Sequence, residues 1–190
     1  MAEPTSRSCP TVNGPAATAR LRAATVRLPA GTARLACRAV STAGERRAHF
    51  RIRHQVFVLE QGLFRGPDGA NGDRDRDARD DDPATVHVVG FADGIICGTV
   101  RLYPLTGMPG RWKGDRLAVL AGHRHHGLGA PLVQFAVATA ALRGGQEMEA
   151  YVQPANVRFF EWLGWRRTGG LVTYAGIPHQ RMLIGLAVPA

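Results

Sequence analysis

Cysteine, lysine and long apolar runs are scarce in this chain of 190 residues. The three cysteines, Cys9, Cys37 and Cys97, lie far apart and form no Cys-x-x-Cys pair. This spacing argues against a disulfide framework or a zinc knuckle and suits a reducing cytoplasm. No apolar run approaches the roughly 20 residues that a membrane-crossing helix needs. We therefore expect a cytoplasmic protein with no membrane span and no metal site.

The charge is strongly basic, with 24 Lys and Arg residues against 15 Asp and Glu residues and a formal net charge of +9. Lys113 is the single lysine, and all other cations are arginine. Such a balance can indicate a nucleic-acid partner. However, the arginines are spread along the chain and no basic patch is interleaved with aromatic residues. We interpret the charge as a composition bias and keep nucleic-acid binding only as a less favoured alternative.

The length fits one domain with a substantial core. Residues 1–32 are rich in Ala, Thr, Pro and Arg and contain one acid, Glu3. They lack the apolar region of a secretory signal, so a disordered extension or a start codon placed too early is the better interpretation. We expect residues 33–190 to form a single domain and residues 1–32 to be dispensable.

Hydrophobic periodicity predicts an α+β (or α/β) domain with a mixed sheet. The expected strands cover residues 35–40, 86–91, 95–103, 115–120, 147–152, 171–175 and 181–186. The expected helices run from Thr42 to about Glu60, from 128 to 142 and from 156 to 163. Thr42 and Glu45 predict a capping box at the first helix, and Ala48, Ile52, Val56 and Leu59 predict its buried face. In the strand at 95–103, Val100 and Leu102 should face opposite to Thr99, Arg101 and Tyr103.

The segment 62–83 combines Gly and Pro with alternating Asp and Arg residues. Its Asp73-x-Asp75-x-Asp77 start is similar to a calcium loop. However, Ala78 stands where that loop needs glycine, and Ala84 where it needs a bidentate glutamate. We interpret the segment as a solvated loop that binds no calcium.

The most informative stretch is residues 124–130, between an apolar strand and an amphipathic helix. One helical face is predicted from Leu128, Leu132, Phe135, Ala136 and Leu142. A glycine-bearing loop before a helix amino terminus forms an anion site, because unpaired N–H groups and the helix dipole converge there. Two alternatives remain, a dinucleotide-binding turn, whose first glycine is missing here, and a plain strand-to-helix turn. A zinc site formed by His123, His125 and His126 is not favoured, since no suitable ligand geometry follows from that spacing.

Four motifs in this order resemble the GNAT superfamily of acyl-CoA-dependent N-acyltransferases. Residues 116–119, followed by Arg-x-x-Gly-x-Gly at 124–129, match its coenzyme A signature, and residues 156–165 resemble its second signature. Residues 56–61 and 176–179 are similar to the ElaA-like branch and to small GNAT proteins encoded beside nitrilases. The early helix also resembles that of acyl-homoserine lactone synthases.

The resemblance implies a mostly antiparallel sheet flanked by helices, with a splay between residues 115–120 and 147–152 that would hold pantetheine. It implies transfer of an acetyl or short acyl group from coenzyme A to the primary amine of a small molecule, by direct attack in a ternary complex and without a metal. Segment 62–83 would be mobile without ligand and help to select the acceptor. The residues implied in coenzyme binding are Leu117, Ala118, Val119, Arg124, His125, His126, Gly127, Leu128, Gly129, Ala130, Asn156 and Phe159.

For catalysis, Glu60 is the first candidate base and Asp115 the second. The tyrosine that usually protonates the leaving thiolate in this superfamily is replaced by Phe160, so water or Tyr174 would have to act instead. Because Phe160 has no proton to give, a catalytically silent acyl-CoA sensor stays as an alternative. His179 would either orient a substrate or bond a backbone carbonyl. The oligomeric state, a homodimer included, is left open.

Overall fold

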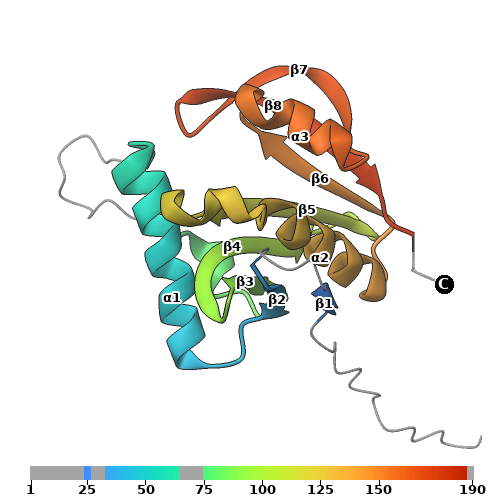
Figure 1. Ribbon diagram of the computed structural model, residues 1–190. Coiled ribbons are helices and arrows are strands. Elements are labelled where there is room, and N and C mark those ends of the chain that lie inside the picture. The colour runs from blue at the N-terminus through green and yellow to red at the C-terminus, as the bar shows by residue number, and fades with distance from the viewer. Residues whose placement is uncertain (1–23, 27–32, 65–74, 188–190) are drawn as a thin grey trace, which may run out of the picture.

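The computed structural model describes residues 24–26, 33–64 and 75–187. Figure 1 shows a twisted sheet with helix α1 on one side and helices α2 and α3 on the other. The strands run in the order β1-β2-β3-β4-β5-β6-β8-β7, and every pair is antiparallel except β5 with β6. In the described part of the chain, no helix has the length and apolarity needed to cross a membrane. The predicted α+β architecture is confirmed.

The strands are β1 (Ala24–Val26), β2 (Leu35–Ala39), β3 (Val86–Ala92), β4 (Ile95–Pro104), β5 (Arg111–Val119), β6 (Glu147–Val152), β7 (Arg166–Tyr174) and β8 (Ile177–Gly185). The α-helices are α1 (Ala43–Arg53), α2 (Gly129–Leu142) and α3 (Val157–Trp162). Strand β1 falls inside the segment expected to be an extension, yet it pairs with β2. The rest of that segment lies outside the described residues.

Helix α1 begins with the predicted capping box, in which Thr42 and Glu45 satisfy each other's backbone N–H groups. It continues directly into a π-helical segment, η1 (His54–Glu60). The prediction that Leu59 shares the buried face of Ile52 and Val56 was wrong, since Leu59 is 53% exposed. A π-helix has more residues per turn than an α-helix. Leu59, which would follow Val56 on the buried face of a continuous α-helix, is therefore rotated toward solvent.

The two faces of the sheet carry different kinds of side chain. Val100 and Leu102 of β4 lie in the main apolar core with α2, whereas Thr99 and Arg101 point to the α1 side, as predicted. Helix α2 buries Leu128, Leu132 and Ala136, but Leu142, in its last turn, is 55% exposed. The predicted apolar face of α2 is therefore correct except at its end.

Strands β5 and β6 pair only at their beginnings. The register joins Arg111–Lys113 of β5 to Glu147–Glu149 of β6, and no pair follows. Strand β5 begins earlier than predicted, because residues 111–114, expected to be loop, pair with β4. Beyond Lys113 the two strands diverge, which confirms the predicted splay and opens the sheet at its centre.

Segment 62–83 was predicted to be a solvated loop, and for Asp75 and Asp80 this prediction was wrong, whereas residues 76–78 are exposed. Asp75 and Asp80 are 3% and 1% exposed. Asp75 binds the Arg53 guanidinium at 2.7 Å, and Asp80 binds it at 2.6 Å. In the sequence, this alternation of Asp and Arg looks the same as that of a solvent-exposed charged segment. In the structure, its carboxylates neutralise arginines that project from α1 and from the sheet. Residues 65–74, and with them the prediction of mobility, lie outside the described residues.

Next to this ion-pair cluster, His49 and His87 are buried side by side. His49 Nδ1 donates to the Val88 carbonyl over 3.1 Å, and its Nε2 lies 3.2 Å from Nδ1 of His87. Burial, with the charge of Arg53 next in importance, lowers the pKa of His49 to about 3. Burial also lowers the pKa of His87. Burial therefore favours the neutral form of both rings in the folded protein.

These pKa shifts predict a loss of stability between about pH 6.5 and pH 3. In that window the unfolded chain binds protons that the folded chain excludes, so the free energy of unfolding falls as the pH falls. The loss from His49 approaches 1.4 kcal/mol per pH unit, or about 2 kcal/mol between pH 7 and pH 5, measurable by urea unfolding. His49→Gln should give a shallower pH dependence. Parallel curves for the variant and the parent would contradict this prediction.

Candidate active site

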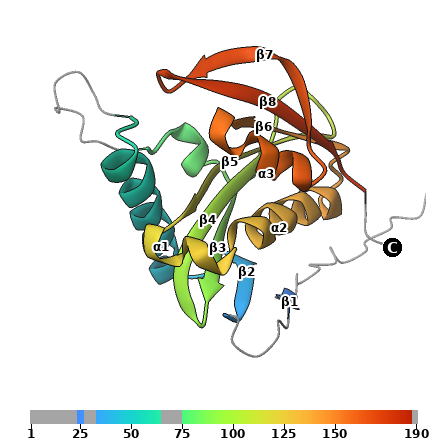
Figure 2. The same ribbon diagram turned by 45° about the horizontal axis from the view of Figure 1, so that its top comes forward.

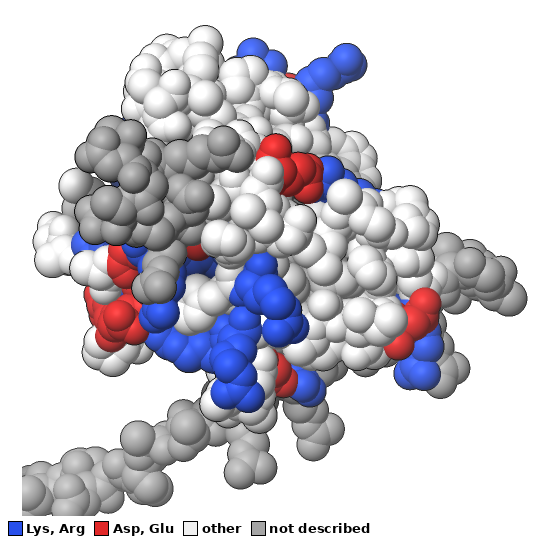
Figure 3. Space-filling view, turned by 90° about the vertical axis from the view of Figure 1, so that its left-hand side faces the viewer, with Lys and Arg blue, Asp and Glu red and all other residues white. Residues whose placement is uncertain are grey.

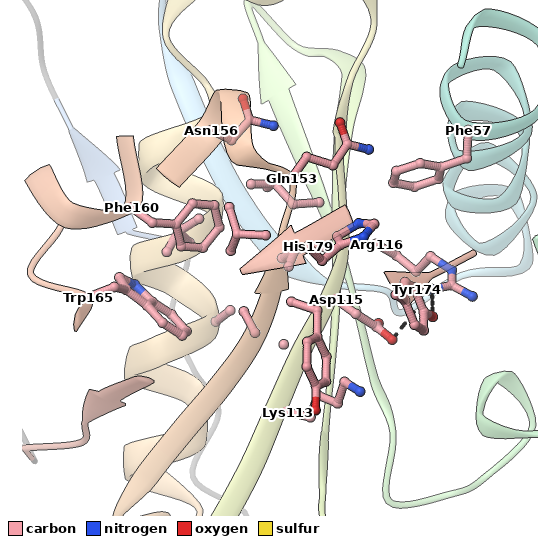
Figure 4. A pocket seen from close by; sticks show the side chains of 18 of the residues that line it. Phe57, Lys113, Asp115, Arg116, Gln153, Asn156, Phe160, Trp165, Tyr174 and His179 are labelled. Atoms are coloured by element: carbon pink, nitrogen blue, oxygen red, sulfur yellow. Dashed lines mark hydrogen bonds and ion pairs between the residues drawn. The ribbon is translucent and has the colours of Figure 1, made fainter. Parts of the chain in front are cut away.

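The splay between β5 and β6 opens into a cavity of about 940 Å³, including space open to solvent (Figure 4). Its floor comes from β5 and β6, and its walls come from α2, α3, η1 and the β7–β8 hairpin. Apolar lining residues belong to two separate core clusters, one beneath α2 and one beneath η1. The cavity therefore crosses the sheet, with a polar side toward α1 and an apolar side toward α2.

A β-bulge places Arg116 on the polar side. Thr99 pairs with Ala118 and Arg101 with Asp115, so β5 holds one more residue than β4 between these pairs. Arg116 lies in this bulge with φ of 53°, a left-handed conformation that costs a residue with a side chain free energy. Its Nη1 donates to the Tyr174 hydroxyl at 2.8 Å. The bulge thus joins the centre of the sheet to the β7–β8 hairpin.

Asp115, which lines the cavity, is tied into the ion-pair cluster. Its two carboxylate oxygens accept from Nε and Nη2 of Arg101 at 2.8 and 2.7 Å. Arg101 is fully buried and also contacts Asp77 and Asp80. Removing the Asp115 carboxylate would leave Arg101 with less counter-charge in a buried position, which is destabilising. Asp115 therefore has a structural task that is independent of any chemistry.

Lys113 also lines the polar side, at the point where the two strands separate. Its ammonium lies 4.4 Å from the centre of the Tyr151 ring. The nearby carboxylates of Asp115 and Glu149 are paired with arginines. Burial lowers the pKa of Lys113, although Asp115 and Glu149 oppose the shift. The chain's single lysine is thus a cation directed at the cavity.

The β7–β8 hairpin brings Tyr174 and His179 to the same wall. Ala175 and Gly176 form its two-residue turn, with φ of 50° and 79°. His179 is 5% exposed, and its Nδ1 donates to the Ile177 carbonyl over 3.0 Å. In the neutral ring this bond leaves Nε2 as a proton acceptor. His179 packs edge-on against Tyr174, with ring centres 5.4 Å apart.

The predicted anion loop lies at the carboxyl end of β5. A 3₁₀ turn, η3 (Ala121–His126), follows the strand, and Gly127 then adopts a left-handed conformation with φ of 74°. Helix α2 begins with no side-chain cap on its first N–H groups. These uncapped N–H groups lie where the sequence predicts that a phosphate binds.

Arg124 and Glu60 contact each other at the edge of this loop. The Arg124 Nη2 donates to both carboxylate oxygens of Glu60, at 2.6 and 2.8 Å, and its Nε donates to the Val119 carbonyl. Both side chains are more than a third exposed, so this pair contributes about 0.2–1 kcal/mol. A phosphate could replace the Glu60 carboxylate on Arg124 at little cost.

The structure divides the predicted site residues into two groups. Asp115, Leu117, Asn156 and Tyr174 line the cavity. The others do not line it: Glu60, Ala118, Val119, Arg124, His125, His126, Gly127, Leu128, Gly129, Ala130 and Phe159. Leu128 is fully buried against the sheet, so only its backbone is available to a ligand. The His125 and His126 rings contact each other at a tilt of 47°, with ring centres 3.8 Å apart.

Sequence reasoning missed several polar residues of the cavity, namely Gln61, Lys113, Arg116, Tyr151 and Gln153. Lys113 offered one signal, because it is the only lysine among 24 cationic side chains. Arg116 offered none, since its direction depends on a bulge that requires the pairing of β4 with β5.

The surface charge does not form a uniform basic patch on the face next to α1. Figure 3 shows arginine and lysine side chains on this face with carboxylates among them. Arg46, for example, pairs with Asp81 at 2.9 Å. Arg53, Arg101 and Arg116 are buried in ion pairs and contribute little to the surface. These three arginines are matched by Asp75, Asp77, Asp80 and Asp115, so the buried cluster adds nothing to the net charge of +9.

Comparison with known proteins agrees with this geometry. Residues 53–165 match the acetyltransferase (GNAT) family model. A protein of Bacillus subtilis (strain 168) named as an acetyltransferase is 28% identical over 138 residues, 70% of this chain and 84% of that protein. An acyl-homoserine-lactone synthase of Ralstonia nicotianae (strain ATCC BAA-1114 / GMI1000) is 32% identical over 146 residues, 63% of this chain and 69% of that protein.

Among solved structures, Escherichia coli ElaA is similar in fold. It has a TM-score of 0.66 and 18% identity, and the match covers 78% of this chain and 98% of ElaA. The order of the motifs, the splayed sheet and the family match all agree. The chain belongs to the acetyltransferase (GNAT) family and is an acyltransferase.

Proposed function

We propose that this protein moves an acyl group from acyl-coenzyme A to the primary amine of a small molecule, by direct attack in a ternary complex. The observation that carries the proposal is the cavity through the splay, which α2 lines with Val133 and Ala136, beyond its uncapped amino end. The pyrophosphate would bind the amides of residues 124–130, and pantetheine would lie between β5 and β6. The thioester would then lie in the cavity, near the backbone of Leu117.

The polar side of the cavity would hold the acceptor amine. Attack on the thioester carbonyl forms the C–N bond, and the amine nitrogen must then lose a proton.

The sequence-based choice for the base is Glu60, but in the structure its carboxylate pairs with Arg124 outside the cavity lining. Asp115 lines the cavity but is paired with Arg101. His179 is better placed than either carboxylate, because it lines the cavity and keeps Nε2 as an acceptor. We therefore assign the base to His179.

The leaving thiolate needs a proton once the C–S bond breaks. Phe160 lines the cavity at the position where the superfamily usually has a tyrosine, and it has no proton to give. The Tyr174 hydroxyl accepts from Arg116 and so keeps its own proton available for donation. We assign the acid to Tyr174.

Thermal unfolding with ligand tests the proposal. Acetyl-coenzyme A at about a hundred times its dissociation constant should raise the melting temperature by roughly 5–10 °C. Thiol release with a panel of small amines should then show turnover. A shift without any thiol release would favour the silent sensor, motivated by Phe160. Salt-sensitive nucleic-acid binding with no shift would instead overturn the proposal.

A further inference from the structure

The apolar side of the cavity has no role in binding an amine or a phosphate. It is lined by Val133 and Ala136 of α2, Met148 and Ala150 of β6, Phe160 of α3 and Trp165, which together we name the apolar compartment. In Figure 4, Phe160 and Trp165 lie across the cavity from Arg116 and Tyr174. Side chains on β6 alternate between the faces of the sheet, so Met148 and Ala150 face α2 whereas Tyr151 faces the polar side. The compartment is thus separated from the polar side by the plane of the sheet.

Small residues keep this compartment open. Ala136 and Ala150 are 2% and 6% exposed and extend only one carbon from the backbone. Gly114, where the strands begin to separate, has no side chain, and a Cβ there would lie 3.3 Å from the Met148 sulfur. Larger residues at these three positions would fill the space. The lining extends along β6 from Met148 to Val152, about 13 Å at the rise of a strand. The single methyl group of acetyl would fill only a small part of that length.

The far wall carries no hydroxyl or charge. Phe160 and Trp165 pack edge to face with ring centres 5.3 Å apart and are 7% and 4% exposed. The buried Trp165 Nε1–H has no hydrogen-bond partner among the described residues, and apart from it this wall offers nothing to replace the hydrogen bonds that a polar group would lose from water. An alkyl chain would instead gain from removal of its surface from water.

We infer that the preferred donor carries a medium-length alkyl acyl chain, longer than acetyl, which the apolar compartment binds. This inference rests on the proposed function, because the thioester must lie at the splay for its acyl chain to point toward α2. It goes beyond the proposed function by assigning a donor class and by giving Phe160 a task. A phenylalanine in place of an acidic tyrosine keeps this wall apolar where the chain would pass.

Calorimetric titration with acetyl-, butanoyl-, hexanoyl- and octanoyl-coenzyme A tests the inference without knowledge of the acceptor. Each buried methylene should tighten binding roughly fourfold until the compartment is full. Octanoyl-coenzyme A should then bind roughly a hundredfold or more tightly than acetyl-coenzyme A. Equal affinity along the series would overturn the inference and leave the proposed function intact. No binding by any of the four would overturn both.

Two variants test where the acyl chain of the donor binds. Ala136→Leu should remove most of the gain for octanoyl-coenzyme A while acetyl-coenzyme A still binds. The matched control is Ala138→Leu, on the same helix but outside the cavity lining, which should keep the gain. Phe160→Tyr, which changes little volume, should also reduce the gain by exposing the chain to a hydroxyl. If both Ala136→Leu and Phe160→Tyr kept the full increase in affinity for octanoyl-coenzyme A, the acyl chain would bind elsewhere, and the inference would be overturned.

Discussion

Gly129→Val should abolish coenzyme A binding while the protein stays folded. Gly129 is the first residue of α2, and an isopropyl group there would occupy the space through which a phosphate oxygen reaches the amides. The fold should survive, because a Cβ at this position would be in ordinary contact with the Phe159 ring at 3.4 Å. Gly127 is less suitable for this test, since its φ of 74° makes any side chain strained.

The measurement is titration with coenzyme A, checked against the thermal unfolding of each variant. Gly44→Val is the matched control, because Gly44 also lies in the first turn of a helix and a Cβ there would meet only Thr42 Oγ1 at 3.8 Å. It should bind coenzyme A normally. Arg124→Ala should be milder than Gly129→Val, because it removes one charge-assisted contact worth about 1.5–3 kcal/mol and leaves the amides in place. Unchanged affinity in Gly129→Val would remove the basis for the phosphate loop.

His179→Gln should lower turnover of a saturating amine by roughly 10²–10⁴-fold, the usual share of a general base. Coenzyme binding should persist, because His179 lies on β8, away from the amides of residues 124–130. The defect should shrink at high pH, where the amine arrives already neutral. Steady-state rates across a pH series, with single-turnover controls, measure both effects.

Two carboxylate variants complete this comparison. Glu60→Gln should reduce turnover less than tenfold, because Glu60 loses only an exposed ion pair with Arg124. Asp115→Asn should chiefly lower stability, because it removes a charge that neutralises the buried Arg101. If turnover fell by two orders of magnitude in Glu60→Gln and stayed normal in His179→Gln, Glu60 would be the base and Arg124 its positioning partner.

The local patterns of the chain were sufficient for most of the secondary structure. The capping box at Thr42, the alternation along β4 and the glycine-terminated helix α2 each depend on neighbours within a few residues. Periodicity failed at Leu59, where the helix widens to a π-helix, and at Leu142, where the helix ends in solvent. In both places the backbone departs from the regular geometry that the pattern assumes.

The sequence by itself determined the fold class and the family resemblance, and it predicts the anion loop, because their motifs are contiguous and their geometry is set locally. Tertiary structure alone decided what the remaining polar residues do. It turned the Asp-rich segment after residue 74 into the counter-charge for Arg53, Arg101 and Arg116. It also paired Glu60 with Arg124 and brought His179, Tyr174 and Lys113 to one cavity. These residues are far apart in the chain, and a charge or an imidazole acquires a role only from the partners and burial that the folded sheet gives it.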